Sequence, residues 1–292
     1  MTTKSDDLVP GVAPRFSLPL PGFIARHNIQ LYLGILIVGG IVLVVAAAPL
    51  LTSFGPATQE LTNTLAPWSR AHPLGTDNLG RDVWSRLLYG GRVNLMIAGV
   101  AVLIPFVAGS LIGALCGYFG GWFDTTVMRI ADVVVAFPFY VLVIALVFVL
   151  GNGPTSIFIS ISLVSWVAYA RIVRAETMIL RDRDFIAACR AGGLPDRRII
   201  LRHVVPNTLT QGIVYGMSDI VMNIGVIVTL SYFGLGIVPP TPDWGQMMAD
   251  GQQFMASGRY GLILVPGVAV VITSLGLALL GDGLGNTLKV RR

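Results

Sequence analysis

Six long apolar runs constrain the fold of this chain more than any other feature of its sequence. Each is close to the length of about 20 residues that an α-helix needs to cross a bilayer. A charged fraction of 12% and a mean hydropathy of +0.76 exclude an ordinary soluble domain, in which about a quarter of the residues are charged. We therefore predict an all-α polytopic membrane protein with six transmembrane helices. The predicted spans are Leu31–Leu51, Val93–Leu115, Ala131–Leu150, Ser156–Ala175, Leu209–Ile237 and Tyr260–Leu280.

The distribution of basic residues predicts how these spans are oriented. Six spans place both chain ends on one side, together with the arginines between the fourth and fifth spans. The segments on the other side hold only Arg70, Arg81, Arg86, Arg92 and Arg259. Because cytoplasmic loops are enriched in Lys and Arg, we expect both termini and residues 171–210 to be cytoplasmic. The net charge of +5 thus reflects topology, and no nucleic-acid partner is expected.

This topology divides the chain into segments with distinct expected roles. Residues 1–30 form a cytoplasmic tail, residues 31–51 the first span, and residues 286–292 a second cytoplasmic tail. Residues 52–92 lie outside the cell and contain an amphipathic helix at the interface, because Val83, Leu87 and Leu88 recur at helical spacing. Residues 93–285 form a core of five helices that includes the cytoplasmic loop 171–210.

The loop 171–210 carries eight arginines and is patterned as two short helices. Asp184 can cap the first helix, and Gly192 and Gly193 can end it. Pro195 and Asp196 suit the first turn of the second helix, and Pro206 is expected to stop it. The apolar face of this second helix would comprise Ile199, Ile200, His203 and Val204. The eight arginines are Arg171, Arg174, Arg181, Arg183, Arg190, Arg197, Arg198 and Arg202.

Two simpler roles for the loop must be weighed, of which the first remains open. A juxtamembrane amphipathic segment could rest on anionic lipid. A helix-turn-helix that reads DNA is disfavoured, because both ends of the loop enter the membrane within a few residues.

The sequence offers no nucleotide, catalytic or metal site. Its two lysines, Lys4 and Lys289, stand at the two ends of the chain and follow no glycine-rich loop, which excludes a phosphate-binding loop. The three histidines fall in three separate segments and cannot share one site in this topology. The two cysteines lie in different environments, so a disulfide is not expected. We expect neither enzyme activity nor a resident cofactor.

Ionisable residues inside spans are expensive and often mark function. Asp219 and Asn223 are four residues apart on the fifth span and would face the same side. They could line a polar translocation path, or they could hydrogen-bond to a neighbouring helix. Arg129 and Asp132, three residues apart, are predicted to form a local ion pair.

The segment Phe185-Ile-Ala-Ala-Cys-Arg-Ala-Gly-Gly193, followed by His203-Val-Val-Pro-Asn207, resembles the cytoplasmic loop of binding-protein-dependent ABC importer permeases. That loop reads Glu-Ala-Ala, a glycine four residues later, and a proline near its end. Here the glutamate is missing and a cysteine replaces the second alanine. The corresponding residues of this chain are Ala187, Ala188, Cys189, Gly193 and Pro206.

Four further motifs narrow the resemblance to the second permease subunit of the dipeptide, oligopeptide and nickel importers. They are His72-Pro-Leu-Gly-Thr-Asp-Asn-Leu-Gly-Arg-Asp82, Met128-Arg-Ile-Ala-Asp132, Phe233-Gly-Leu-Gly-Ile-Val-Pro-Pro-Thr-Pro-Asp-Trp-Gly245 and Leu280-Gly-Asp-Gly-Leu284. The resemblance covers residues 31–292 and implies the fold of a type I ABC importer permease.

The resemblance also implies a location in a bacterial inner membrane, partners and a contact surface. The partners would be a second homologous permease, two cytoplasmic ABC ATPases that bind ATP and Mg, and an extracytoplasmic solute-binding protein. The solute would be a di- or oligopeptide, with nickel chelates, glutathione, opines and oligosaccharides as alternatives. A scaffold or sensor subunit that moves no solute is a second class of function. The implied ATPase-coupling residues are Phe185, Ala187, Ala188, Arg190, Gly193, His203 and Pro206.

Overall fold

The computed structural model describes the backbone of residues 21–289 and the side chains of residues 29–288. Within this range the chain is all-α, as predicted. Five helices are long and apolar enough to cross a membrane, and two shorter helices, bent at their junction, complete a sixth candidate span. Residues 1–20 of the predicted tail 1–30 and residues 290–292 of the predicted tail 286–292 lie outside the described residues.

The elements follow one another from the first span to the last. They are α1 (Pro21–Ala46), α2 (Ala48–Leu51), the 3₁₀ turn η1 (Leu61–Asn63), α3 (Val83–Phe119), α4 (Gly121–Val135), α5 (Phe139–Leu150), α6 (Pro154–Arg181), α7 (Asp184–Ala191), α8 (Asp196–Ile199), the π-helical segment η2 (Ile200–Val204), α9 (Val205–Tyr232), α10 (Trp244–Gln252), the 3₁₀ turn η3 (Met255–Ser257) and α11 (Gly261–Lys289).

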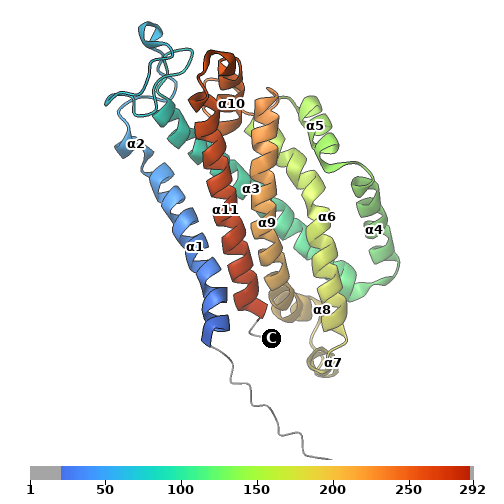
Figure 1. Cartoon of the computed structure of the whole chain (residues 1–292). Coiled ribbons are helices and arrows are strands. Elements are labelled where there is room, and N and C mark those ends of the chain that lie inside the picture. Colours follow the sequence, from blue (N-terminus) through green and yellow to red (C-terminus); the bar gives the residue numbers. More distant parts are fainter. Residues whose placement is uncertain (1–20, 290–292) are drawn as a thin grey trace, which may run out of the picture.

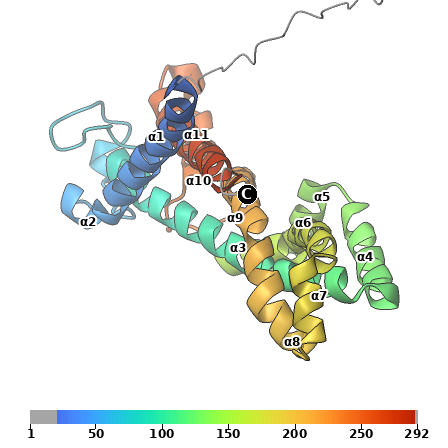
Figure 2. The same cartoon turned by 90° about the horizontal axis from the view of Figure 1, so that it is seen from below.

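The long helix α3 crosses the whole molecule diagonally and organises the rest (Figure 1). It packs most extensively on α6 and also contacts α9. Helices α1 and α11 form a second pair, which joins the others through α9 (Figure 2). The beginning of α1 and the end of α11 lie at the same end of the bundle as α7 and α8, which we name the loop end.

Small residues explain the close approach of α3 to α6. Gly109, Gly113 and Gly117 recur at every fourth position of α3, and a Cβ atom at any of them would overlap with main-chain atoms of α6. Inside a membrane, where apolar side chains gain little by leaving lipid, such small residues let two backbones pack closely. This stripe therefore fixes the line along which α3 and α6 meet.

The third span was predicted as one helix over Ala131–Leu150, and this prediction was wrong. The structure breaks the segment after Val135, and α4 and α5 meet at an angle of 86°. Pro138 has no amide hydrogen to donate and disfavours helical geometry in the residue before it. It stands immediately before the first residue of α5, so the helix restarts in a new direction.

The predicted amphipathic helix at the outer interface was also wrong. Val83 and Leu88 are buried, and the segment that contains them is the first part of α3. Asp82 caps this helix by accepting a hydrogen bond of 2.7 Å from the backbone amide of Ser85. Residues 83–92, at the end of the predicted outer segment 52–92, therefore form the start of the 37-residue helix α3.

Three further boundaries differ from prediction. Helix α1 starts at Pro21, within the predicted tail 1–30, and α11 continues to Lys289, within the predicted tail 286–292. The first span also ends earlier than expected, because a turn at Ala47 separates α1 from α2. Pro49 lies in the first turn of α2, where a missing amide hydrogen is tolerated.

Residues 52–82 and 233–260 fold together at the end of the bundle opposite the loop end (Figure 1). We name these two segments the cap. Arg81 joins them with hydrogen bonds of 2.6 Å to Asp77 and 2.9 Å to Asp250. The indole of Trp244 donates a 2.9 Å hydrogen bond to the carbonyl oxygen of Leu87, which ties α10 to the first turns of α3.

Candidate functional site

Helix α7 begins and ends close to where the sequence predicted. Asp184 is its first residue instead of its cap, and the preceding Arg183 makes no side-chain capping bond. At the other end, the amide of Gly192 bonds to the carbonyl of Ala188 at 2.9 Å. Gly193 then adopts a φ of +74°, a conformation that a residue with a Cβ enters only at a cost. Gly193 thus reverses the chain, as expected.

The second short helix does not stop at Pro206, so that expectation was wrong. It begins at Asp196, widens into the π-helical segment η2, and continues without a break into α9. Pro206 occupies the first turn of α9, directly after η2. Its missing amide hydrogen is tolerated there, because the hydrogen-bond pattern is already widened to that of a π-helix. The loop is therefore joined rigidly to a membrane helix on its C-terminal side.

A small apolar core holds the two short helices against the bundle. Ile186 of α7 and Ile199 of α8 are fully buried, together with Ala114 of α3 and Val173 of α6. Burial of one such side chain contributes about 1.5 to 3 kcal/mol. We name residues 184–204, which comprise α7, α8 and η2, the α7–α8 unit. This unit is packed on α3 and α6. The simpler interpretation of the loop would require it to rest freely on lipid, and it does not.

Two cross-links add polar contacts to this core. The hydroxyl of Tyr118, near the end of α3, donates a 2.6 Å hydrogen bond to the carboxylate of Asp196 at the start of α8. The guanidinium of Arg190 on α7 donates to the same hydroxyl at 3.3 Å and stacks over the ring of Tyr118, 4.9 Å from its centroid. One buried tyrosine therefore contacts both helices of the loop.

The structure divides the eight arginines of the loop into two groups. Three of them lie on α6 and fasten helices together. Arg171 bonds to Asp132 at 2.7 Å, and Arg174 binds both carboxylate oxygens of Asp124 on α4, at 2.5 and 2.6 Å. Arg181 donates to the carbonyl of Gly117 at 3.2 Å. The predicted Arg129–Asp132 ion pair is confirmed at 3.6 Å.

The remaining arginines lie on the loop itself. Arg197, Arg198 and Arg202 are exposed around the exposed side chain of Leu201, where they line a shallow depression. An apolar residue with a basic rim forms a surface suited to a partner with an acidic rim. Of the predicted coupling residues, Phe185, Ala187, Ala188 and Gly193 are also exposed, while His203 is half-buried.

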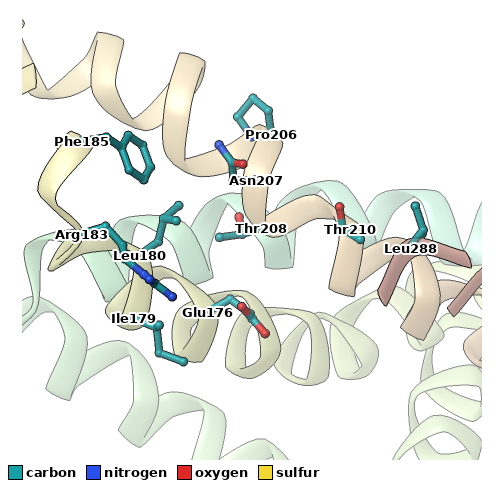
Figure 3. Close-up of a pocket in the computed structure, with 10 residues that line it drawn as sticks. All are labelled: Glu176, Ile179, Leu180, Arg183, Phe185, Pro206, Asn207, Thr208, Thr210 and Leu288. Carbon is teal, nitrogen blue, oxygen red and sulfur yellow. The ribbon is translucent and has the colours of Figure 1, made fainter. Parts of the chain in front are cut away.

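An open groove of about 590 Å³ runs between α6 and the start of α9 at the loop end. Figure 3 shows Ile179 and Leu180 of α6 on one side, Asn207 and Thr208 of α9 on the other, and Phe185 of α7 near Pro206. The groove thus connects the surface of the loop with the two helices that carry it. Its other lining residues are Glu176, Arg183, Thr210 and Leu288.

Asp219 and Asn223 lie on one face of α9, as expected from their spacing, and both are buried. The hydroxyl of Tyr169 on α6 donates a 2.9 Å hydrogen bond to the carboxylate of Asp219. This is the inter-helix hydrogen bond that the sequence left open as an alternative. A role of either residue in a translocation path stays a prediction.

Sequence reasoning missed Tyr118, Asp124 and Tyr169, because their partners lie 50 or more residues away in the chain. No local pattern points to such pairs. A signal was present for the glycine stripe of α3, since its regular spacing is visible in the sequence.

The bundle of long apolar helices defines a polytopic membrane protein, and comparison with known proteins specifies its class. Residues 109–291 match the family described as "Binding-protein-dependent transport system inner membrane component". The chain belongs to this family. It is a permease component of a binding-protein-dependent transport system in a bacterial inner membrane, a transport subunit and not an enzyme.

Two relatives illustrate the match. The chain is 36% identical over 263 residues to the dipeptide transport system permease protein DppC of Alkalihalophilus pseudofirmus. The aligned region covers 90% of this chain and 86% of the relative. The chain is 38% identical over 220 residues to the glutathione transport system permease protein GsiD of Pectobacterium atrosepticum. Here the aligned region covers 75% of this chain and 73% of the relative.

Proposed function

We propose that this chain is one of two permeases of an ATP-driven importer and forms the translocation path with a second, homologous permease. Two cytoplasmic ATPases, which bind ATP and Mg, would contact the α7–α8 unit, and a solute-binding protein would dock on the cap. The observation that supports this best is the construction of the α7–α8 unit. It exposes Phe185 and Leu201 at its surface, yet its own core packs it on the membrane helices.

Such a unit can transmit a mechanical push. A short helix seated in a groove of a partner moves with that partner, and here the helix is continuous with α9 through η2. Closure of the ATPase pair on ATP would move the two permeases relative to each other and turn the path outward. Hydrolysis would then restore the inward-facing state. This coupling requires different contact free energies at the loop in the two states.

We propose a di- or oligopeptide as the solute. The named relatives transport a dipeptide in one case and glutathione, itself a tripeptide, in the other. Both solutes carry an ammonium group and carboxylates. We propose that Asp219 and Asn223 border the path where α6 and α9 face its interior, with Asp219 as the negative group nearest a passing ammonium.

Uptake into liposomes tests this function. The chain would be reconstituted with its second permease, its ATPases and its binding protein, and radiolabelled dipeptide, tripeptide and glutathione would be supplied outside. We expect ATP-dependent accumulation of at least one of these solutes and no ATP hydrolysis by the isolated chain. Binding without accumulation would favour the alternative, a sensor subunit that reports solute occupancy.

A labelling experiment tests the orientation. A cysteine at Arg197, on the exposed face of α8, should react with an impermeant maleimide only after the membrane is opened. A cysteine at Trp68 in the cap, which is 72% exposed, should react in intact cells. The opposite pattern would invert the proposed topology. Since the chain has two natural cysteines, a variant with both replaced by alanine is the background.

A further inference from the structure

The two ends of α3 are anchored to different functional parts of the molecule. The helix has 37 residues, which corresponds to a length of about 55 Å. It runs without interruption through Pro105, from the cap to the loop end. A continuous helix of this length can act as a lever if it is held firmly at both ends.

At the cap, α3 is held by several contacts. Asp82 caps its first turn, and the indole of Trp244 bonds to the carbonyl of Leu87. Arg86 is 1% exposed and lies 3.5 Å from Asp77 and 3.7 Å from Asp250. Because these partners come from both segments of the cap, the first turns of α3 and the cap form one unit.

At the loop end, Tyr118 provides the polar attachment of α3 to α7 and α8 within the described part of the chain. The ring of Tyr118 belongs to the core of the loop and is 5% exposed. Its hydroxyl donates to Asp196 of α8 and accepts from Arg190 of α7. Another polar contact at this end, from Arg181 to the carbonyl of Gly117, joins α3 to α6 and not to the two loop helices.

We propose that Tyr118 is the positioning residue that transmits movement of the α7–α8 unit through α3 to the cap. The proposal rests on the proposed function, in which α7 and α8 contact the ATPases. Tyr118 touches neither nucleotide nor solute, and acts by keeping the loop in register with α3. Without its hydroxyl, the loop still packs through apolar contacts, but its orientation relative to α3 is less strictly defined.

The hydroxyl group can be removed with little change in packing. In Tyr118→Phe the ring remains beneath Arg190, so the stacking contact stays, while both hydrogen bonds disappear. We expect ATP hydrolysis by the reconstituted complex to continue at close to its normal rate. The number of solute molecules imported per ATP should fall roughly tenfold, since a hydrogen bond to a charged group stabilises one geometry by about that factor.

Four further variants sharpen this test. Tyr32→Phe removes the hydroxyl of an exposed tyrosine on α1, away from the cap and the loop, and should leave the ratio unchanged. Asp196→Asn keeps an acceptor oxygen for Tyr118 and should retain more import per ATP than Asp196→Ala. If Tyr118 and Asp196 act as one unit, Tyr118→Phe combined with Asp196→Ala should be no worse than the more severe single variant.

A readout at the cap separates transmission from simple loosening of the loop. A fluorophore on a cysteine at Trp68 should respond to ATP in the parent complex and lose most of that response in Tyr118→Phe. Unchanged import per ATP in a well-assembled Tyr118→Phe complex, or a cap that still responds fully, would overturn the proposal. If Tyr118→Phe fails to assemble, the same comparison is made with Asp196→Ala.

The proposed function itself fails in a different way. A parent complex that accumulates no solute with ATP would refute the importer, whatever Tyr118 does. A parent complex that imports normally, and whose Tyr118→Phe variant does so as well, would refute only the role of Tyr118.

Discussion

The hydroxyl of Tyr169 on α6 lies 2.9 Å from the carboxylate of Asp219 on α9 and donates a hydrogen bond to it. The ring of Tyr169 also packs edge-on against Phe106 of α3, with centroids 5.7 Å apart, and against Tyr215 of α9 at 4.9 Å. One side chain thus brings three membrane helices together at a polar contact in the bundle.

Removal of this hydroxyl should destabilise the bundle. Tyr169→Phe leaves the Asp219 carboxylate buried without its donor, which costs about 1 to 3 kcal/mol. The purified protein in detergent should therefore melt at a lower temperature. Tyr215→Phe is the matched control, because its ring packs at the same place and it has no hydrogen bond to Asp219 among the described residues.

The same site allows structure to be separated from transport. If Asp219 also borders the path, Asp219→Asn should keep an acceptor for Tyr169 and much of the stability, but reduce uptake of peptides with a free ammonium group. Uptake of an N-acetylated peptide should fall less. Equal loss for both solutes would leave Asp219 with a structural role alone.

The cap offers a comparison between two buried arginines. Arg81 lies 2.6 and 2.9 Å from Asp77 and Asp250, whereas the corresponding distances from Arg86 are 3.5 and 3.7 Å. Two nitrogens of Arg86 have no hydrogen-bond partner within the described part of the chain. Arg81 therefore supplies the stronger pairing, although both guanidinium groups are out of solvent.

We expect Arg81→Met to destabilise the cap by about 3 kcal/mol, because it leaves two carboxylates without their close partner. Arg86→Met should cost markedly less, since a buried charge with imperfect bonds contributes little net stability. Limited proteolysis within residues 52–82 would measure both. Greater cleavage in Arg86→Met than in Arg81→Met would show that this ranking by geometry is wrong.

The sequence allowed the general architecture to be predicted, but not how helices end or which residues pair between them. Runs of apolar residues report the length of a span directly, and Gly193 was identified because a positive φ favours a residue without a Cβ. Pro138 was noticed only as an interruption, since a proline can kink a membrane helix or break it, depending on what surrounds it.

The first turns of α3 show a different limit. The sequence placed Arg86 and Arg92 outside the second span, in a segment with an amphipathic helix at the outer interface, and an arginine is costly in a span unless something pairs with it. The partner of Arg86, Asp250, is supplied by α10, more than 150 residues further along the chain. Pairings across such separations are properties of the fold and cannot be found from local spacing.

Asp243 should make the stability of the cap depend on pH. It lies outside the spans, is fully buried, and caps α10 by accepting hydrogen bonds from the amides of Gly245 at 2.8 Å and Gln246 at 3.2 Å. Burial raises the pKa of this carboxyl from 3.8 to about 6, although the capping bonds and nearby Arg86 act in the opposite direction.

The sign of the effect follows from proton binding. Between about pH 4 and pH 6 the folded protein binds more protons at Asp243 than the unfolded chain does. The stability contributed by this group is therefore fully present below about pH 4 and is lost as the pH rises through 6. The shift corresponds to at most about 3 kcal/mol.

Replacement by asparagine should remove this dependence. Asp243→Asn keeps an acceptor for both amides but does not titrate, so its melting temperature should change less between pH 7 and pH 5 than that of the parent. The measurement is thermal unfolding of the two proteins side by side across that range. Parallel pH profiles would mean that Asp243 does not titrate in this window.

Gly193 offers the sharpest test of the loop, because a substitution there changes the conformation that the backbone can adopt and removes no side-chain contact. Its φ of +74° is strained for a branched residue, and no atom lies within 4 Å of the position that a Cβ would occupy. Steric overlap with neighbours therefore does not contribute. Gly193→Val should cost about 1 to 3 kcal/mol of backbone strain and reorient α8 relative to α7.

Asparagine tolerates positive φ better than other residues with a Cβ, so Gly193→Asn is the matched variant. We expect Gly193→Val to lower solute-stimulated ATP hydrolysis and uptake strongly, while Gly193→Asn retains most of both. Affinity for the binding protein should be unchanged in both, since the cap is at the opposite end of the molecule. Normal uptake by an assembled Gly193→Val complex would show that the turn between α7 and α8 does not couple ATP hydrolysis to transport.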